Sequence, residues 1–536
     1  MLSRRSSCLL IFTFVVSFFV VPEFSRAQKA KTHVLSADEA KEVKKDAASL
    51  FATTDYKGAL KAYLDLYQTD KENPEINFRI GYCYLQTNSK KLALPYLEKA
   101  NQAKEPRKEG QFYMGLAYMY NARWDEAIQA FTNYKDASHN KLVKDFLAPD
   151  RYIEMCMNGK ELSAHPVNVQ FTNLGKSVNS MYEDYNPFIS ADGKSLLFTT
   201  RRKGNVGGFI EDLGIFTADI YSTQWRDTLW TKAKSLGGLV NGEWDEEAVG
   251  VTAAGDQVFI YFDNADNFAD IGVASIKGKT WQKPVMLPEK INSKQYEGGA
   301  CISLDGSTLY FSSNRKDGVG GNDIWISHRF ENGDWEMPVN AGKNINTKFD
   351  EESPFLTMDG KILYFSSKGH NSMGGYDIFR STWDEKNKTW GEAVNVGFPI
   401  NDAEDNAFFS MTGDGRTAYL SAVRDSGIGD RDIYQVTFND TIDHPFLALI
   451  SGTVASATGS GRIELSKVTL ENKDTRENLV YRPAVPSNYF VLCGRPGHYR
   501  LRVEGYNFAE YSEDIEIPAG FPPAPLTRAI QVKLSK

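Results

Sequence analysis

Residues 354–365 read PFLTMDGKILYF, two short apolar runs on either side of an Asp-Gly pair. This pattern predicts a β-hairpin, because a tight turn needs positive φ, which Gly supplies and Asp tolerates. Other parts of the chain repeat the pattern, at 187–198, 249–262, 300–311 and 408–420, and the copy at 249–262 is the weakest. The turn aspartates are therefore predicted to shape turns and not to catalyse a reaction.

The same polar residues flank every copy. An Asn that follows a β-branched residue precedes each hairpin, and an Asp-Ile pair comes after it. The asparagines are Asn179, Asn241, Asn292, Asn346 and Asn401, and the aspartates are Asp219, Asp270, Asp323, Asp377 and Asp432. Successive asparagines are 62, 51, 54 and 55 residues apart. A period of roughly 50 residues with about four strands per unit is typical of a β-propeller.

The repeat resembles that of TolB-like proteins, as in residues 187–194, PFISADGK, with Phe198 downstream. The resemblance implies a β-propeller over residues 165–440. We expect five blades, one for each copy, and keep six as the alternative because TolB-like domains often have six. A strand from Val167 to Phe171 would complete the last blade and close the ring between the two ends of the domain.

An acidic residue stands just before the first strand of every blade. These blade-start acids are Asp184, Glu246, Glu297, Glu351 and, allowing one inserted residue, Asp405. Blades related by rotation would place the carboxylates in a ring at one mouth of the central channel, where they would hold a divalent cation or attract a basic segment. In the alternative interpretation, which we favour, each carboxylate accepts backbone N–H bonds where its blade begins. No cofactor or metal is therefore expected.

A second repeat, with a period of 34 residues, occupies about residues 40–139. Gly81 recurs as Gly115, and Leu97 recurs as Phe131. Small residues let paired helices approach closely, large ones fill the space between pairs, and stacking buries the apolar faces. The pattern resembles the tetratricopeptide repeat, although the usual Trp near the start of each unit is missing. We expect helical repeats over 36–160, ending in a capping helix from Lys141 to Met157 that is interrupted at Pro149.

In the tetratricopeptide family, the first helix of each repeat lines a concave binding face. The resemblance assigns six residues to that face: Phe78, Tyr82, Gln86, Phe112, Met119 and Tyr120. These side chains would grip a peptide or a partner helix. The alternative, which stays open here, is that several of them fill the core between repeats.

The C-terminal residues, 446–536, alternate apolar and polar residues in the manner of strands. The segment 497–506, GHYRLRVEGY, resembles the carboxypeptidase regulatory-like domain. That resemblance implies a small transthyretin-like β-sandwich that serves as a non-catalytic spacer or stabilising module.

The first 27 residues read as a secretory signal. Two arginines precede an apolar run of about 14 residues, too short to span a bilayer as a helix, and a small-x-small site ends at Ala27. We expect cleavage there and no transmembrane segment in the mature chain, rather than a retained anchor. The remaining 58 basic and 68 acidic residues leave ten net negative charges. This charge disfavours nucleic acid and anionic lipid as partners.

Four cysteines lie beyond the signal, at Cys83, Cys156, Cys301 and Cys493. Their wide spacing shows neither a C-x-x-C pair nor a dense framework, so buried free thiols are expected. A disulfide between Cys83 and Cys156, on neighbouring helices, is the alternative.

The order of the three modules resembles envelope proteins of Bacteroidetes-type bacteria that usually end in an OmpA-like peptidoglycan-binding domain, one of which belongs to the type IX secretion system. The chain stops at Lys536, where that domain would begin, so peptidoglycan anchoring is not expected. The resemblance implies an exported scaffold, periplasmic or associated with the outer membrane through envelope proteins of secretion or gliding machinery.

Catalytic motifs do not stand out in the chain. The sequence contains no H-E-x-x-H, no G-x-S-x-G and no Walker loop. We therefore expect a non-enzymatic protein that mediates protein–protein interactions. A glycan- or cation-binding propeller is the alternative, and a propeller hydrolase is the third hypothesis.

Overall fold

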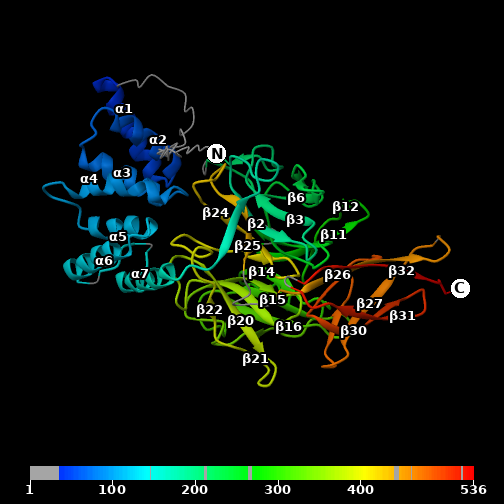
Figure 1. Ribbon diagram of the computed structural model, residues 1–536. Coiled ribbons are helices and arrows are strands. Elements are labelled where there is room, and N and C mark those ends of the chain that lie inside the picture. Colours follow the sequence, from blue (N-terminus) through cyan, green and yellow to red (C-terminus); the bar gives the residue numbers. More distant parts are fainter. Residues whose placement is uncertain are drawn as a thin grey trace, which may run out of the picture.

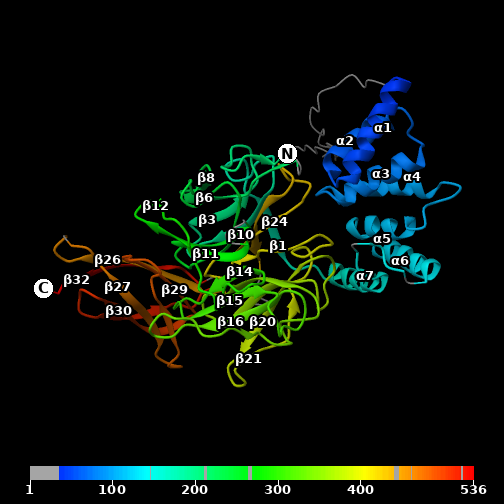
Figure 2. The same cartoon turned by 180° about the vertical axis from the view of Figure 1, so that it is seen from behind.

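The computed structural model describes residues 35–139, 141–144, 146–210, 214–263, 268–439, 446–459, 461–520 and 523–535. Helices form the N-terminal part, antiparallel sheets form the middle, and a smaller group of sheets forms the C-terminal part (Figure 1). The view from behind shows the same order, with the central sheets between the helices and the C-terminal sheets (Figure 2). The predicted signal, residues 1–27, lies outside the described residues.

Seven α-helices make up the described helical region, in antiparallel pairs followed by a last helix. They are α1 (Ala37–Ala52), α2 (Tyr56–Tyr67), α3 (Pro74–Leu85), α4 (Leu94–Asn101), α5 (Gly110–Tyr120), α6 (Trp124–Ser138) and α7 (Pro149–Ala164). A 3₁₀ turn, Lys90–Ala93, precedes α4. The first helix begins with a capping box, in which Ser36 and Glu39 satisfy each other's backbone N–H groups.

The glycines of the 34-residue repeat lie where paired helices touch. A Cβ on Gly81 would lie 2.5 Å from Leu97 Cγ, and one on Gly115 would lie 2.7 Å from Phe131 Cδ1. Any larger side chain would push α3 away from α4, or α5 away from α6. This close approach is the packing that the sequence pattern predicts, and it gives the region its TPR-like character.

The last helix differs from its prediction. It begins at Pro149 and runs to Ala164, rather than running from Lys141 to Met157 with an interruption. Proline is well suited to the first position of a helix, where its missing N–H has no partner to lose and its fixed φ is already helical. Pro149 therefore starts α7 and does not break it.

Five antiparallel sheets of four or five strands form the described middle region. The first contains β2 (Asp184–Ile189), β3 (Ser195–Thr200), β6 (Asp219–Arg226), β7 (Leu229–Trp230) and β8 (Lys234–Ser235). The second contains β9 (Asp245–Val251), β10 (Gln257–Asp263), β11 (Phe268–Lys277), β12 (Thr280–Trp281) and β13 (Val285–Met286). The third contains β14 (Glu297–Ile302), β15 (Thr308–Ser313), β16 (Asp323–His328) and β17 (Val339–Asn340).

The fourth sheet contains β18 (Glu351–Leu356), β19 (Ile362–Ser367), β20 (Asp377–Asp384), β21 (Thr389–Trp390) and β22 (Val394–Asn395). The fifth contains β23 (Ser410–Met411), β24 (Thr417–Ala422), β25 (Asp432–Phe438) and β1 (Val169–Asn173). Strand β1 pairs with β25, so that Val169 faces Phe438. The expectation that an early strand completes the last sheet is thus confirmed, two residues later than predicted. A small hairpin, β4 (Phe209–Ile210) with β5 (Ile215–Phe216), stands apart from these sheets.

The repeated asparagines join each sheet to the next. The Asn346 side chain accepts a hydrogen bond from Ile324 N at 2.8 Å and donates one to Ile324 O at 2.9 Å. Asn241, Asn292 and Asn401 make the same two bonds to the isoleucine of the preceding Asp-Ile pair. Asn179 makes them to Ile433, 254 residues away, and so links the first sheet to the fifth. The middle region is therefore a closed, propeller-like ring.

The C-terminal region consists of two small sheets around one core. One sheet has the order β29-β26-β32, from β26 (Ala448–Ser456), β29 (Tyr489–Gly494) and β32 (Leu526–Val532). The other has the order β28-β27-β30-β31, from β27 (Leu465–Asn472), β28 (Asn478–Tyr481), β30 (Gly497–Gly505) and β31 (Tyr511–Ile517). Ile450 and Phe490 from the first sheet share a buried cluster with Val468 and Leu501 from the second.

The four described cysteines are all buried free thiols, as the sequence predicts. Burial raises the pKa of Cys83 to about 12 and that of Cys156 to about 12, which keeps both protonated and unreactive. The alternative of a disulfide between these two residues is therefore not realised in the structure.

Candidate binding site at the propeller mouth and on the helical face

The central channel has two different ends. The innermost strands β2, β9, β14 and β18 begin at the blade-start acids and run towards the Asp-Gly turns. The end at the acids is called the mouth below, and the opposite end is called the turn end. The helices contact the mouth, since Asn88 donates to Glu183 at 2.6 Å and Lys57 pairs with Asp430 at 2.8 Å.

The C-terminal sheets cover the turn end. The residues just before the Asp or Gly of the turns, Ala191, Ala253, Leu304 and Met358, belong to the apolar cluster of the C-terminal region. The Tyr489 hydroxyl also donates to Asp192 at 2.9 Å. The turn aspartates thus shape turns, as predicted, and their neighbours form a docking platform that the sequence analysis missed. In the sequence, the signal for this platform was an apolar residue within each otherwise polar turn.

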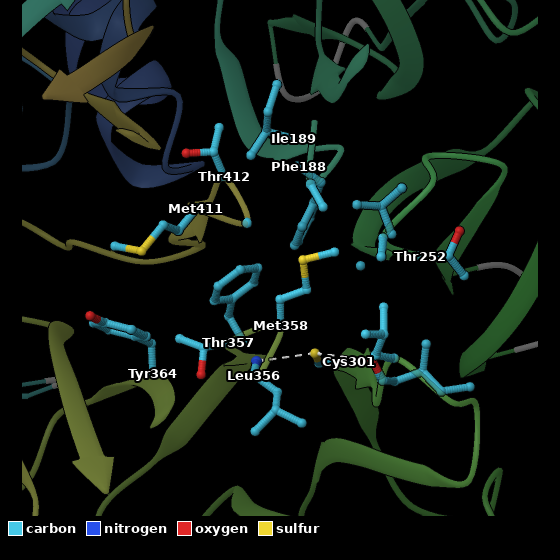
Figure 3. A pocket seen from close by; sticks show the side chains of 18 of the residues that line it. Phe188, Ile189, Thr252, Cys301, Leu356, Thr357, Met358, Tyr364, Met411 and Thr412 are labelled. Carbon is cyan, nitrogen blue, oxygen red and sulfur yellow. Dashed lines mark hydrogen bonds between the residues drawn. The ribbon is translucent and has the colours of Figure 1, made fainter. Parts of the chain in front are cut away.

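An apolar cavity of about 80 Å³ lies between the channel and the C-terminal sheets. Phe188, Met358 and Met411 face it from three different blades (Figure 3), and Leu447 closes it from the C-terminal side. Cys301 also lines the cavity, and its Sγ accepts a hydrogen bond from Leu356 N at 3.2 Å. Burial raises the pKa of this thiol to about 11. The cavity at the turn end is therefore apolar and covered by the C-terminal region.

Four blade-start acids occupy equivalent, buried positions. Each accepts a hydrogen bond from the backbone N–H four residues earlier: Asp184 from Ser180 at 2.6 Å, Glu246 from Gly242, Glu297 from Ser293 and Glu351 from Thr347, each at 2.7 Å. All four are at most 4% exposed. This is the arrangement that the favoured structural interpretation expects, and it leaves these carboxylates engaged at the blade starts.

The fifth predicted acid, Asp405, does not occupy the equivalent position. Asn406 does: its side chain accepts from Asp402 N at 2.8 Å, four residues earlier. Its own N–H donates to Tyr376 O at 2.6 Å, just as Glu351 N donates to Asn322 O. The fifth repeat therefore has the same spacing as the other four, and no inserted residue is needed between Asn401 and its blade-start residue. An Asn serves the fifth blade because the position needs a hydrogen-bond acceptor and not a charge.

The four acids differ in their electrostatic surroundings. Asp184 pairs with Arg202, and Glu297 pairs with Arg315 at 3.1 Å. Glu246 and Glu351 have no cationic partner among the described residues, and burial raises the pKa of each to about 7. No group of three or more His, Cys, Asp or Glu side chains among the described residues is arranged to hold a metal ion.

The six residues predicted for the helical face separate into two groups. Phe78, Phe112 and Met119 are buried in the helical core, which was the alternative left open. Tyr82 and Tyr120 are partly exposed, and Gln86 is exposed. Met119 and Tyr120 also line a hollow together with Phe398 and Glu404 of the propeller-like region. Part of the predicted face is thus taken up by contacts within the chain.

An aromatic row runs along the helices beside Tyr82. The ring of Tyr82 lies 5.1 Å from Phe51 and 5.2 Å from Tyr113, and Tyr113 lies 6.0 Å from Phe146. Arg79 lies over Phe51, 4.2 Å from the ring centroid. Phe51, Tyr82 and Phe146 remain partly exposed. Of this row, only Tyr82 was predicted from the sequence, although Phe51 and Tyr113 also lie on the first helices of their pairs, α1 and α5.

Comparison with known proteins yields similarity to solved structures alone. No protein-family model and no curated protein matches the chain. The helical part is similar to the MamA RS-1 ArsTM double mutant, at 19% identity, a TM-score of 0.21 and coverage of 24% of this chain and 68% of that one. The β-rich part is similar to TolB from Acinetobacter baumannii, at 13% identity, a TM-score of 0.28 and coverage of 57% and 67%.

Penicillium chrysogenum α-L-arabinanase complexed with arabinobiose is also similar, at 12% identity, a TM-score of 0.31 and coverage of 50% of this chain and 98% of that one. These likenesses are too distant to say anything about function. A separate observation concerns membranes: in the part of the chain that the structure describes, none of the helices has the length and apolar character of a membrane span.

Proposed function

We propose that the protein is a non-enzymatic scaffold that binds other proteins through its helical face and through the mouth of its propeller-like region. The observation that carries the proposal is the aromatic row, which stays partly exposed although the helices already contact the propeller-like region elsewhere. Aromatic and arginine side chains dominate the energetics of protein interfaces, and here Arg79 lies directly beside the row.

The division of the channel supports the same function. Its turn end is covered by the C-terminal region, so the mouth is the end that faces away from these sheets. The cavity at the turn end is apolar, and the Cys301 thiol in it is kept protonated by its surroundings. An arrangement with one closed end suits docking better than the passage of a substrate.

We further propose an identity for each of the three regions. The helices would be tetratricopeptide repeats, the ring a five-bladed TolB-like propeller, and the C-terminal sheets a transthyretin-like, carboxypeptidase regulatory-like module that stabilises the ring. The partners would be envelope proteins, of type IX secretion or gliding machinery, met after export to the periplasm. This placement rests on the sequence resemblance and on the predicted signal.

Crosslinking and mass spectrometry on the native envelope test the proposal. We expect crosslinks from the helical face to envelope proteins, and we expect Tyr82→Ala and Gln86→Arg to remove them. Gln86 is exposed, so its replacement should leave the fold intact. Tyr506→Ala is the matched control, since Tyr506 is 80% exposed on the C-terminal region. A protein that is monomeric and uncrosslinked to any envelope partner would contradict the scaffold function.

A further inference from the structure

A second ring of residues lies at the mouth, one position after each blade-start residue. Its members are Tyr185, Glu247, Gly298, Glu352 and Ala407. Successive side chains of a strand point to opposite faces, so this inner ring does not share the contacts of the blade-start acids. Two of its five positions are carboxylates, which sequence reasoning passed over because they do not recur in every blade.

Glu247 is the more open of the two carboxylates. It accepts a hydrogen bond from the Tyr185 hydroxyl at 2.7 Å, and Asn186 approaches it at 3.4 Å. Arg201 lies 3.4 Å away but makes a shorter pair, of 2.6 Å, with Asp245. The Glu247 side chain remains 22% exposed at the mouth. The arginine is therefore shared between two acids, and the group carries net negative charge.

Glu352 is buried and has no cationic partner among the described residues. It accepts hydrogen bonds from Ser312 and Asn322, both at 2.6 Å. Tyr296 bonds to it as well, and the Tyr296 hydroxyl lies where a Cβ on Gly298 would be. All these donors are neutral, and burial raises the pKa of the Glu352 carboxyl. A buried carboxylate held only by neutral groups gains strongly when a cation arrives.

Tyrosine side chains lie near both carboxylates. The Tyr261 and Tyr296 rings are 5.6 Å apart, and both are partly exposed. Burial, with Asp263, Glu247 and Glu352 nearby, raises the pKa of Tyr261 to about 12. Tyr376 lies in the same negative field, which includes Glu352 and Asp350. Partly exposed aromatic faces beside carboxylates are the surroundings that a cationic side chain prefers.

The fifth position of the ring leaves a hydroxyl without a partner. Ser312 of the third blade donates to Glu352 of the fourth, and Ser366 is its equivalent in the fourth blade, one residue before the strand end. The corresponding position in the fifth blade is Ala407, which has no acceptor to offer. Ser366 is 1% exposed, and its Oγ has no hydrogen-bond partner within the described residues. Ser366 is also the cross-strand partner of Glu352 between β18 and β19, so its unpartnered hydroxyl can bond to a ligand that reaches this carboxylate.

We propose that the inner ring at the mouth binds one cationic side chain, lysine or arginine, that projects from a protein partner into the space between Glu247 and Glu352. The inference rests on the proposed scaffold function and names the chemistry of the partner for the propeller-like region. Charge complementarity selects the occupant: two carboxylates, four tyrosines and one shared arginine attract a cation more strongly than a neutral group. The tyrosine faces favour an organic cation over a metal ion.

Short peptides test the inference on the full chain. The probes are acetylated pentapeptides, Gly-Ser-X-Ser-Gly amide, with Lys, Arg, Gln or Glu at X, titrated by microscale thermophoresis. We expect the Lys or Arg peptide to bind at least about tenfold more tightly than the Gln peptide, and less tightly as salt rises. Glu352→Gln and Glu247→Gln should each lower that affinity about tenfold or more.

The matched control is Glu331→Gln, which changes an exposed acid at the turn end and should leave peptide affinity unchanged. Equal affinity for the Lys and Gln peptides, or full affinity in the Glu352→Gln and Glu247→Gln variants, overturns the inference. Binding of a trimer of N-acetylglucosamine without binding of the Lys peptide also overturns it and assigns the mouth to saccharides. Loss of crosslinks in Tyr82→Ala tests the scaffold function separately, because Tyr82 lies on the helices.

Discussion

A single amide side chain connects each blade to the next. The asparagine clamp hydrogen-bonds to both the N–H and the C=O of one isoleucine, and the same C=O also accepts a backbone hydrogen bond, as Ile324 O does from Ala341 N at 3.0 Å. Asn is suited to this role because its side chain carries the same donor and acceptor as a peptide group. The recurrence of Asn after a β-branched residue in each of the five repeats is therefore explained by geometry and not by chemistry.

Replacing one clamp should destabilise the ring. In Asn346→Ala, the buried N–H of Ile324 loses its partner, whereas Ile324 O keeps the hydrogen bond from Ala341 N at 3.0 Å, and we expect a loss of about 2 kcal/mol in the free energy of unfolding. Urea denaturation followed by circular dichroism measures it. Asn387→Ala is the control, because Asn387 is exposed and bonds only within its own turn. Equal losses in the two variants would contradict the clamp.

The buried carboxyl of Glu351 predicts a dependence of stability on pH. Its pKa is raised to about 7 in the folded chain, against 4.5 for an ordinary glutamate, so the folded state keeps a proton that the unfolded state releases. The buried carboxyl therefore lowers the free energy of unfolding when the pH favours its ionised form. This loss is absent below pH 4.5, grows as the pH rises towards 7 and reaches about 3 kcal/mol. Glu351→Gln, which cannot ionise, should escape this cost.

The measurement compares the free energies of unfolding of Glu351→Gln and the wild type at pH 5 and pH 8. We expect the variant to gain on the wild type by up to about 3 kcal/mol between these two values. The exposed Glu331→Gln serves as the control, with no comparable gain. A difference that stays constant from pH 5 to pH 8 would show that the carboxyl ionises in the folded chain as it does in solution.

At the scale of elements, α7 attaches the helical region to the ring. Its Arg151 is 8% exposed and donates to Lys368 O at 2.6 Å, to Gly369 O at 3.2 Å and to Ser372 Oγ at 2.7 Å. The guanidinium also lies 4.7 Å from the Phe349 ring. The planar fork of an arginine matches several carbonyls at once. Arg151 thus joins α7 to this loop of the propeller-like region, in addition to the contacts of Asn88 and Lys57 at the mouth.

Removing this attachment should free the helices. In Arg151→Leu, the loop carbonyls lose their donor, and we expect faster proteolysis between α7 and β1, around residues 165–168. Limited digestion with proteinase K, which does not require Lys or Arg, and mass spectrometry follow the cleavage, and small-angle scattering should show a larger radius of gyration. Arg107→Leu is the control, since Arg107 contacts only helical residues. Unchanged cleavage in Arg151→Leu would mean that the remaining contacts suffice.

In the molecule as a whole, the C-terminal sheets cover one end of the channel. They contact the turns of several blades together, through Tyr489 to Asp192 and through Leu447 N to Asp414 O at 2.9 Å. The cavity behind them is lined by residues from all the innermost strands. The C-terminal region therefore contacts the turns of the first and fifth sheets at one end of the ring, and the mouth lies at the other end.

The rate of thiol labelling should show how well the C-terminal region protects this cavity from solvent. In the folded wild type, Cys301 should resist Ellman's reagent and maleimides, because it is buried behind Leu447 with a pKa of about 11. Leu447→Ala enlarges the opening, and we expect Cys301 to react severalfold faster. Peptide mapping by mass spectrometry identifies the labelled residue, and Cys83 and Cys156 serve as internal controls. Parallel acceleration at all three cysteines would indicate general unfolding and contradict a local seal.

Local patterns predicted much of the architecture and little of the site. The spacing of Gly81 and Gly115, the Asp-Gly turns and the clamp asparagines all act over one or two neighbouring elements, so their roles can be read from the chain. The inner ring at the mouth could not be read in this way. Glu247 and Glu352 are 105 positions apart, and neither belongs to a motif that recurs in every blade.

Periodicity and turn chemistry are local properties of the chain, and they predicted the order of helices, propeller-like ring and C-terminal sheets. The wide spacing of the cysteines favoured buried thiols but left a disulfide between Cys83 and Cys156 open, which the structure does not contain. Only the tertiary structure decided that Asn406, not Asp405, completes the set of blade-start residues, and that the C-terminal sheets close the turn end. The physical reason is that ring closure sets which side chains meet across blades, and those meetings join residues that are far apart in the chain.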